Sequence, residues 1–254
     1  MSDNPSTTYP EKVRASHFSQ TGFEMRQAIA PSTSSPDERV FSAIYDAVQG
    51  QRLVPGLKLK EMELANLFKV SRTSVRNALL RLAHKGLVDI APNRGAIVAQ
   101  LSPEDCRQLY EARRAIEGTI VEILAQRRTP AIVKSLRAHV TAQRRAFERS
   151  DTKEGYRLAI AFHRLLAELA GNRILAQVLD DLLSRMPLVI LTIGSQRSAN
   201  DATHADHIEL VEAIAAGRAA NARRILSRHL QHLEDDLNEQ RPAAARSLAE
   251  MLAI

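Results

Sequence analysis

The sequence predicts a mostly α-helical protein with one short β element in its first hundred residues. Aromatic residues make up only 4% of the 254 residues and Trp is absent, whereas the helix-favouring residues Leu, Ala, Arg and Glu are abundant. From position 102 onward, nearly every window carries apolar residues at helical spacing. With 44% apolar residues, the chain can bury more than one core.

The first hundred residues divide into a tail and a compact domain. Residues 1–35 are rich in Ser, Thr, Pro and Gln and are expected to be a disordered tail. A helix begins at Pro36 and ends at Gly50; two more, 61–68 and 72–85, are joined by a short turn, as in a helix-turn-helix. The apolar runs LVDI and AIVA flank PNRG and predict a hairpin. Residues 36–100 are therefore expected to form a winged helix-turn-helix.

The rest of the chain predicts an all-helical antiparallel bundle of six or seven helices over residues 101–238. Pro187 is expected to kink the fourth of these helices. Residues 239–254 are expected to be a tail or a short helix. The predicted bundle helices cover 102–128, 130–149, 152–170, 172–193, 201–216 and 218–238.

Cysteine content and charge restrict the class of protein. A single cysteine, Cys106, excludes an internal disulfide. The sequence contains no run of 18 apolar residues that would predict a membrane span. We therefore expect a cytoplasmic protein without a membrane partner. Residues 37–100 carry 10 Lys/Arg against 6 Asp/Glu, whereas residues 101–254 carry 22 against 20. The early segment is the expected seat of a polyanionic partner.

The helix from residue 72 has two distinct faces. Thr73, Arg76 and Asn77 lie opposite its apolar side, and Arg72 lies at the flank near the helix start; packing does not require polar residues at these positions. Arg can pair with guanine or phosphate and Asn with adenine, so this helix is expected to read DNA. Taken singly, each of these residues is as compatible with an ordinary solvated surface position as with a contact to DNA. The apolar side consists of Val75, Ala78, Leu79 and Leu82.

This segment resembles the winged-helix domain of the GntR family of bacterial transcription regulators. The similarity covers GLKLKEMELANLFKVSRTSVRNALLRLAHKGLVDIAPNRGAIV and departs from the family pattern at Ser74 and Asn77. The resemblance implies that Arg72, Thr73, Arg76 and the wing residue Gly95 lie at the DNA. We add Arg94, at the hairpin tip, on its charge alone.

Three histidines, His163, His207 and His229, lie on the apolar stripes of three different predicted helices. Singly, each is more often a core histidine with a partner than a ligand. Together they can converge inside a bundle, where imidazoles suit Zn, Ni or a similar divalent ion. Arg113 also lies on an apolar stripe and needs an anion, which either Glu117 or a ligand could supply.

Residues 103–233 resemble the FCD effector-binding domain of one GntR subfamily. The resemblance rests on the pattern at Glu111, Arg113 and Glu117, on FH at His163, on GN at Asn172, and on the 22-residue spacing from His207 to His229. It implies a metal site at His163, His207 and His229 and an effector site at Arg113, Glu117 and Asn172. Ala159 stands where the family has an Asp ligand, which weakens the case for a bound metal.

We therefore expect a dimeric regulator, by default a repressor, which binds a double-stranded DNA operator and responds to a small organic acid. A metal-responsive regulator is the first alternative. A metalloenzyme with three histidine ligands is the second, and we expect no enzyme because the relevant stripes hold no carboxylate placed as a general base.

Overall fold

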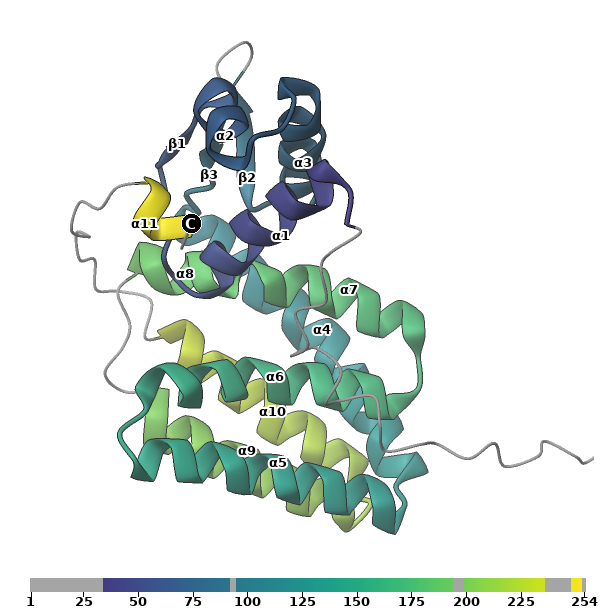
Figure 1. Ribbon diagram of the computed structural model, residues 1–254. Coiled ribbons are helices and arrows are strands. Elements are labelled where there is room, and N and C mark those ends of the chain that lie inside the picture. Colours follow the sequence, from purple (N-terminus) through teal and green to yellow (C-terminus); the bar gives the residue numbers. More distant parts are fainter. Residues whose placement is uncertain (1–33, 92–94, 194–198, 236–247, 253–254) are drawn as a thin grey trace, which may run out of the picture. The chain divides into compact units, whose positions relative to one another are not determined.

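The computed structural model describes residues 34–91, 95–193, 199–235 and 248–252 (Figure 1). All its helices and strands lie in one compact unit, Ser35–Ile254. In chain order they are α1 (Pro36–Gln49), β1 (Lys58–Leu59), α2 (Glu61–Phe68), α3 (Arg72–His84), β2 (Val88–Ala91), β3 (Gly95–Val98), α4 (Pro103–Arg127), α5 (Pro130–Glu148), α6 (Thr152–Ala170), α7 (Arg173–Ser184), α8 (Met186–Ile193), α9 (Ala199–Ala215), α10 (Ala219–Asp235) and α11 (Leu248–Leu252). None of these helices is both long and apolar enough to cross a membrane.

The N-terminal domain, residues 36–99, consists of α1 to α3 and a small antiparallel sheet. The side chain of Ser71 caps α3 by accepting from the amide of Ser74 at 3.1 Å. The predicted hairpin is present as β2 and β3, and β1 pairs with the other edge of β3, so the strand order is β1-β3-β2. The third strand was not predicted, because two residues are too few to show a period of two.

The C-terminal bundle follows the predicted helices closely, with one correction. The single helix expected at 172–193 is two helices, because α7 ends at Ser184 and α8 begins at Met186. Pro187 stands in the first turn of α8, where its missing N–H costs nothing, whereas within a continuous helix it would clash with the preceding turn. The proline therefore separates two helices instead of kinking one. The fold is mostly α, as predicted.

Two hydrophobic cores hold the described residues together. One lies within the bundle, and the other lies within the N-terminal domain. Helix α8 contributes to both: Met186 and Val189 belong to the bundle core, whereas Leu188 is fully buried in the N-terminal core. Met251 and Leu252 of α11 also complete the N-terminal core, although they lie far from it in the sequence.

Candidate functional site

The predicted DNA-reading side chains share the exposed face of α3. Arg72, Thr73, Arg76 and Asn77 are all exposed. The opposite face, formed by Val75, Ala78, Leu79 and Leu82, is buried against the N-terminal core. The division between the two faces is therefore as the sequence predicts, and the polar face is available to a partner.

Glu61, at the start of α2, holds both arginines. Arg76 donates from Nε and Nη2 to the two carboxylate oxygens of Glu61 at 3.0 Å each, and Arg72 donates from Nη2 to Glu61 Oε2 at 3.0 Å. Hydrogen bonds from Arg76 and Arg72 lower the pKa of the Glu61 carboxyl, so it is ionised at neutral pH. The two guanidinium groups are thus fixed side by side. No pattern in the sequence indicated this contact, because Glu61 lies on another helix.

Gly95 opens β3 in a conformation that only glycine adopts easily. Its φ is +93°, and a Cβ atom built there would lie 2.1 Å from the backbone oxygen of Leu59. Glycine therefore permits the close approach of β3 to β1 at the base of the wing. Arg94, which we predicted at the wing tip, lies outside the described residues.

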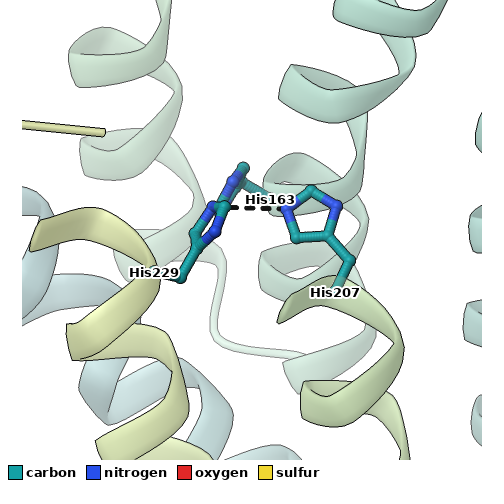
Figure 2. Close-up of side chains that lie close together, drawn as sticks. All are labelled: His163, His207 and His229. Atoms are coloured by element: carbon teal, nitrogen blue, oxygen red, sulfur yellow. Dashed lines mark hydrogen bonds between the residues drawn. The ribbon is translucent and has the colours of Figure 1, made fainter. Parts of the chain in front are cut away.

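The three predicted ligand histidines converge in the bundle (Figure 2). His163 comes from α6, His207 from α9 and His229 from α10, and all three are buried. One ring nitrogen of each lies within 4.8 Å of the others, and the Nε2 atoms of His207 and His229 are 3.3 Å apart. No other such group of metal-ligand side chains occurs among the residues that the structure describes.

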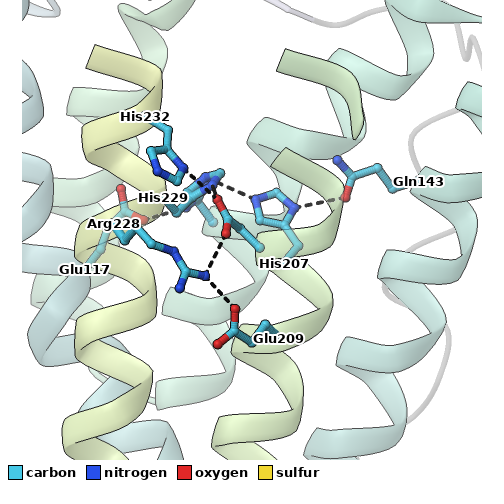
Figure 3. Close-up of polar contacts among 9 residues, drawn as sticks. Glu117, Gln143, His207, Glu209, Arg228, His229 and His232 are labelled. Atoms are coloured by element: carbon cyan, nitrogen blue, oxygen red, sulfur yellow. Dashed lines mark hydrogen bonds and ion pairs between the residues drawn. The ribbon is translucent and has the colours of Figure 1, made fainter. Parts of the chain in front are cut away.

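An acceptor on the outside of the cluster lies near Nδ1 of each histidine. Glu117 Oε2 lies 2.5 Å from Nδ1 of His163, and Gln143 Oε1 lies 3.0 Å from Nδ1 of His207 (Figure 3). Asp206 Oδ2 lies 3.5 Å from Nδ1 of His229.

Two of these acceptors, Glu117 and Gln143, fix the tautomers of the imidazoles that they contact. Because the acceptors of His163 and His207 are oxygens, the proton of each of these neutral imidazoles belongs on Nδ1, and Nε2 keeps its lone pair for the centre of the cluster. His229 Nδ1 makes no hydrogen bond, so Asp206 does not fix its tautomer.

Burial sets the ionisation of the cluster. Burial lowers the pKa of His163 to about 4 against the opposing charge of Glu117, and burial also lowers the pKa of His207 and of His229. The three imidazoles are therefore neutral at neutral pH. Neutral imidazole is the form that binds a metal ion or accepts a hydrogen bond from a ligand.

The internal partner of Arg113 is present. Arg113 Nε donates to Glu117 Oε1 at 2.7 Å, and both side chains are almost completely buried. Burial alone would raise the pKa of Glu117, but the charges of Arg113 and His163 and their hydrogen bonds lower it to about 2. Arg113 Nη1 also donates to the Sδ atom of Met186 at 3.5 Å. Glu117 thus links the guanidinium group to the histidine cluster.

Asn172 has a local role. Its side-chain oxygen accepts from the amides of Ile174 and Leu175 at 3.2 Å each and caps the start of α7. Its predicted part in effector binding stays a prediction beside this structural role.

Gln143 and Asp206 were not among the predicted site residues. Gln143 lies on an apolar stripe of α5 with Leu136 and Val140, and all three are buried. The periodicity test that selected the histidines would also have selected this glutamine. Asp206 directly precedes His207 in the sequence, but its proximity to His229 on the next helix depends on tertiary packing.

Family models match both parts of the chain. The model of bacterial regulatory proteins of the gntR family matches residues 36–98, and the FCD domain model matches residues 108–232. The two matches coincide with the N-terminal domain and with most of the helical bundle.

Curated relatives span most of the chain. The HTH-type transcriptional repressor RspR of Escherichia coli strain K12 is 27% identical over 209 residues, which cover 82% of this chain and 92% of RspR. An uncharacterized HTH-type transcriptional regulator of Streptomyces ambofaciens is 30% identical over 203 residues, covering 80% of this chain and 85% of that protein. HTH-type transcriptional regulator LutR of Bacillus subtilis is 26% identical and covers 75% of this chain and 96% of its own length.

Solved structures share the fold. The crystal structure of a "putative transcriptional regulator GntR from Rhodococcus sp. RHA1" superposes with a TM-score of 0.70 at 24% identity, covering 80% of this chain and 98% of that one. E. coli McbR/YncC superposes with a TM-score of 0.69 at 20% identity, and the match covers 80% of this chain and 97% of that one. At these identities the likeness concerns the fold alone.

Proposed function

The chain belongs to the gntR family of bacterial regulatory proteins and carries an FCD domain, and from this premise we propose that it binds an operator as a homodimer and releases it when a small organic acid enters the bundle. The family consists of DNA-binding transcription regulators, so the chain is a regulator and not an enzyme. The dimer, the direction of the response and the effector are parts of our proposal.

The observation that carries the effector site is the orientation of the three imidazoles. Because Nδ1 of His207 donates to Gln143, Nε2 of His207 carries a lone pair, and this atom lies 3.3 Å from Nε2 of His229. His229 either donates a proton from Nε2 to this lone pair or directs a second lone pair at it. Two lone pairs repel at this distance unless a cation or a proton lies between them. Two nitrogens bound to one tetrahedral Zn²⁺ are about 3.3 Å apart, as bond lengths of about 2.05 Å require. The nitrogen donors therefore fit a divalent ion such as Zn²⁺ or Ni²⁺.

The ligand set has one carboxylate fewer than the family pattern, because Ala159 stands where that pattern has an Asp ligand. A bound ion would supply a Lewis acid for a carboxylate oxygen of the effector. Glu117 and Asp206 provide negative charge around the cluster, and through Nδ1 they increase the basicity of His163 and His229. Without a metal, the same Nε2 atoms would accept hydrogen bonds from the effector directly.

Arg113 connects this pocket with the N-terminal domain. An anion that competes with Glu117 for the guanidinium group would alter the contact between Arg113 Nη1 and Met186 Sδ. Met186 lies on α8, which also buries Leu188 in the N-terminal core. We propose that α8 transmits the state of the pocket to the DNA-binding domain.

A dimer is proposed because one winged helix with a small charge excess would bind DNA weakly, whereas two recognition helices can occupy two half-sites at fixed spacing. Repression is the proposed direction, and RspR is named as a repressor. The metal-responsive regulator is the second candidate, favoured by the histidine geometry alone.

The first experiment separates the metabolite sensor from the metal sensor. Operator sequences are selected in vitro with the full chain, and binding is then titrated with small organic acids in the presence and absence of Zn²⁺ or Ni²⁺. Weakening of operator binding only when an acid is present supports our proposal. A response to metal alone, whatever the acid, favours the metal-responsive regulator instead.

A pair of histidine variants, one on α10 and one on α9, tests the pocket. His229→Ala should leave operator binding intact but remove the response to the acid, and His207→Ala should behave likewise. Arg224→Ala is the control on α10, because Arg224 is exposed and donates to Asn221 instead of to the cluster. A normal response by both His229→Ala and His207→Ala would place the pocket elsewhere.

The recognition helix has its own test. Arg76→Ala should abolish specific binding to the selected operator while the bundle stays folded, as circular dichroism would show. Arg223→Ala, which removes an exposed arginine of the bundle paired with Glu122, is the control. Unchanged specific affinity of Arg76→Ala at matched salt would argue against reading by α3.

A further inference from the structure

A small hollow with both apolar and charged lining residues lies beside the arginines that Glu61 holds. It has a volume of about 110 Å³ and lies between α3 and the hairpin, with Leu80, Ile90 and Arg76 among its lining residues. Leu80 is 51% exposed and Ile90 is 42% exposed, two of the few large apolar side chains that stand this open in the described chain. The hollow therefore offers an apolar contact on a surface otherwise occupied by charges.

Leu80 stands in the same exposed row of α3 as the residues expected to read DNA. It lies one helical turn beyond Arg76 and two turns beyond Thr73, on the side opposite the buried Val75 and Leu82. An isolated exposed leucine needs no explanation. This one interrupts the exposed polar row of α3, in which every other member can form hydrogen bonds.

Glu61 restricts the movement of the two neighbouring guanidinium groups. It binds Arg76 through both carboxylate oxygens and Arg72 through one, all at 3.0 Å. Glu61 also lines the hollow. The arginines are thus held at one edge of the hollow.

We propose that Leu80 is a further specificity-determining residue, and that its side chain, with the hollow beside it, takes the 5-methyl group of a thymine in the major groove. The inference rests on the proposed reading of DNA by α3. Thymine is the base that presents a methyl group in the major groove, and an apolar side chain is the group that recognises it. The hollow is larger than a methyl group, and Arg76, one of the residues expected to read the operator, is among its lining residues.

The test removes only the methyl group. In the operator selected with the full chain, each thymine is replaced in turn by deoxyuridine, which keeps every hydrogen-bonding group of the base. At one thymine in each half-site, wild-type affinity should fall about fourfold, as expected for the loss of one buried methyl-sized group. Leu80→Ala should bind the thymine operator more weakly and should lose the distinction between thymine and deoxyuridine at that position alone.

Ile174→Ala provides the matched control, because Ile174 is an equally large aliphatic side chain, 69% exposed, on α7 of the bundle. It should discriminate as the wild type does. Leu80→Ala should stay folded, since Leu80 is exposed and alanine favours helix.

The proposal is overturned if no single deoxyuridine weakens wild-type binding, or if Leu80→Ala discriminates as strongly as the wild type. It is equally overturned if Leu80→Ala loses only dimer formation, which would make the hollow a contact between two copies. If the wild type selects no sequence at all, the proposed operator binding fails instead, so the two failures are distinguishable.

Discussion

Replacing Glu117 with glutamine should destabilise the bundle strongly, because the change leaves a buried positive charge without its partner. Glu117 accepts from Arg113 at 2.7 Å and contacts His163 at 2.5 Å, and its side chain is 1% exposed. Glutamine has nearly the same shape, so packing should change little. The amide can still accept from Arg113, but it carries no charge.

The expected loss is about 3–5 kcal/mol, the usual consequence of removing one partner of a buried ion pair. For a unit of about 200 residues, this corresponds to a decrease of about 6–20 °C in the midpoint of thermal unfolding. Differential scanning calorimetry and circular dichroism at neutral pH would both measure it. The transition followed should be that of the bundle, since a protein with two cores need not unfold in one step.

Glu122→Gln is the matched control. Glu122 lies on the same helix and pairs with Arg223 at 2.8 Å, but 31% of its side chain and 46% of that of Arg223 are exposed. Its loss should cost about 1 kcal/mol or less. If Glu117→Gln were as mild as Glu122→Gln, the charge of Glu117 would not be what compensates Arg113, and the reasoning would be refuted.

Three further outcomes are expected. Gly95→Ala should lower stability and weaken operator binding, because its Cβ atom would meet the backbone oxygen of Leu59 at 2.1 Å; unchanged thermal unfolding would contradict this. The pKa of Glu117 is about 2 when folded against an ordinary value of 4.5, so its contribution to stability is complete above pH 4.5 and is lost as the pH falls towards 2. Urea unfolding across that range should show that the free energy of unfolding falls less steeply with decreasing pH in Glu117→Gln than in the wild type. If the chain binds a divalent ion, Gln143→Leu should weaken that binding about 10- to 100-fold, because His207 loses the acceptor that orients it; equal affinity in a competition with a chromogenic chelator would exclude the role.

Local periodicity predicted the elements and the faces of the helices. The apolar stripes that carry His163, His207 and His229 were sufficient to predict that all three side chains are buried. The apolar side of α3 likewise predicted that the polar residues on its other side are exposed. The two-residue strand β1 and the division of α7 from α8 were missed. The strand is too short to show a pattern, and a proline fits equally a kink and the first turn of a new helix.

Contacts between elements could not be predicted in the same way. Glu61 meets Arg76 only because α2 packs on α3, and Gln143 meets His207 only because α5 packs on α9. Neither pair has a fixed spacing in the sequence. The chemistry of the site was therefore predictable by residue type, whereas the partners that orient each group required the three-dimensional arrangement.

The three side chains that α8 and α11 insert into the N-terminal core also limit how this regulator can be recombined. Leu188, Met251 and Leu252 are each at most 4% exposed in that core, yet all three lie outside the segment 36–98 that matches the DNA-binding family model. A chimaera made by grafting a relative's DNA-binding segment onto this bundle would juxtapose surfaces that were not shaped for each other. Transplanting operator specificity therefore requires α8 and α11 to move with the segment, or a graft confined to the exposed face of α3.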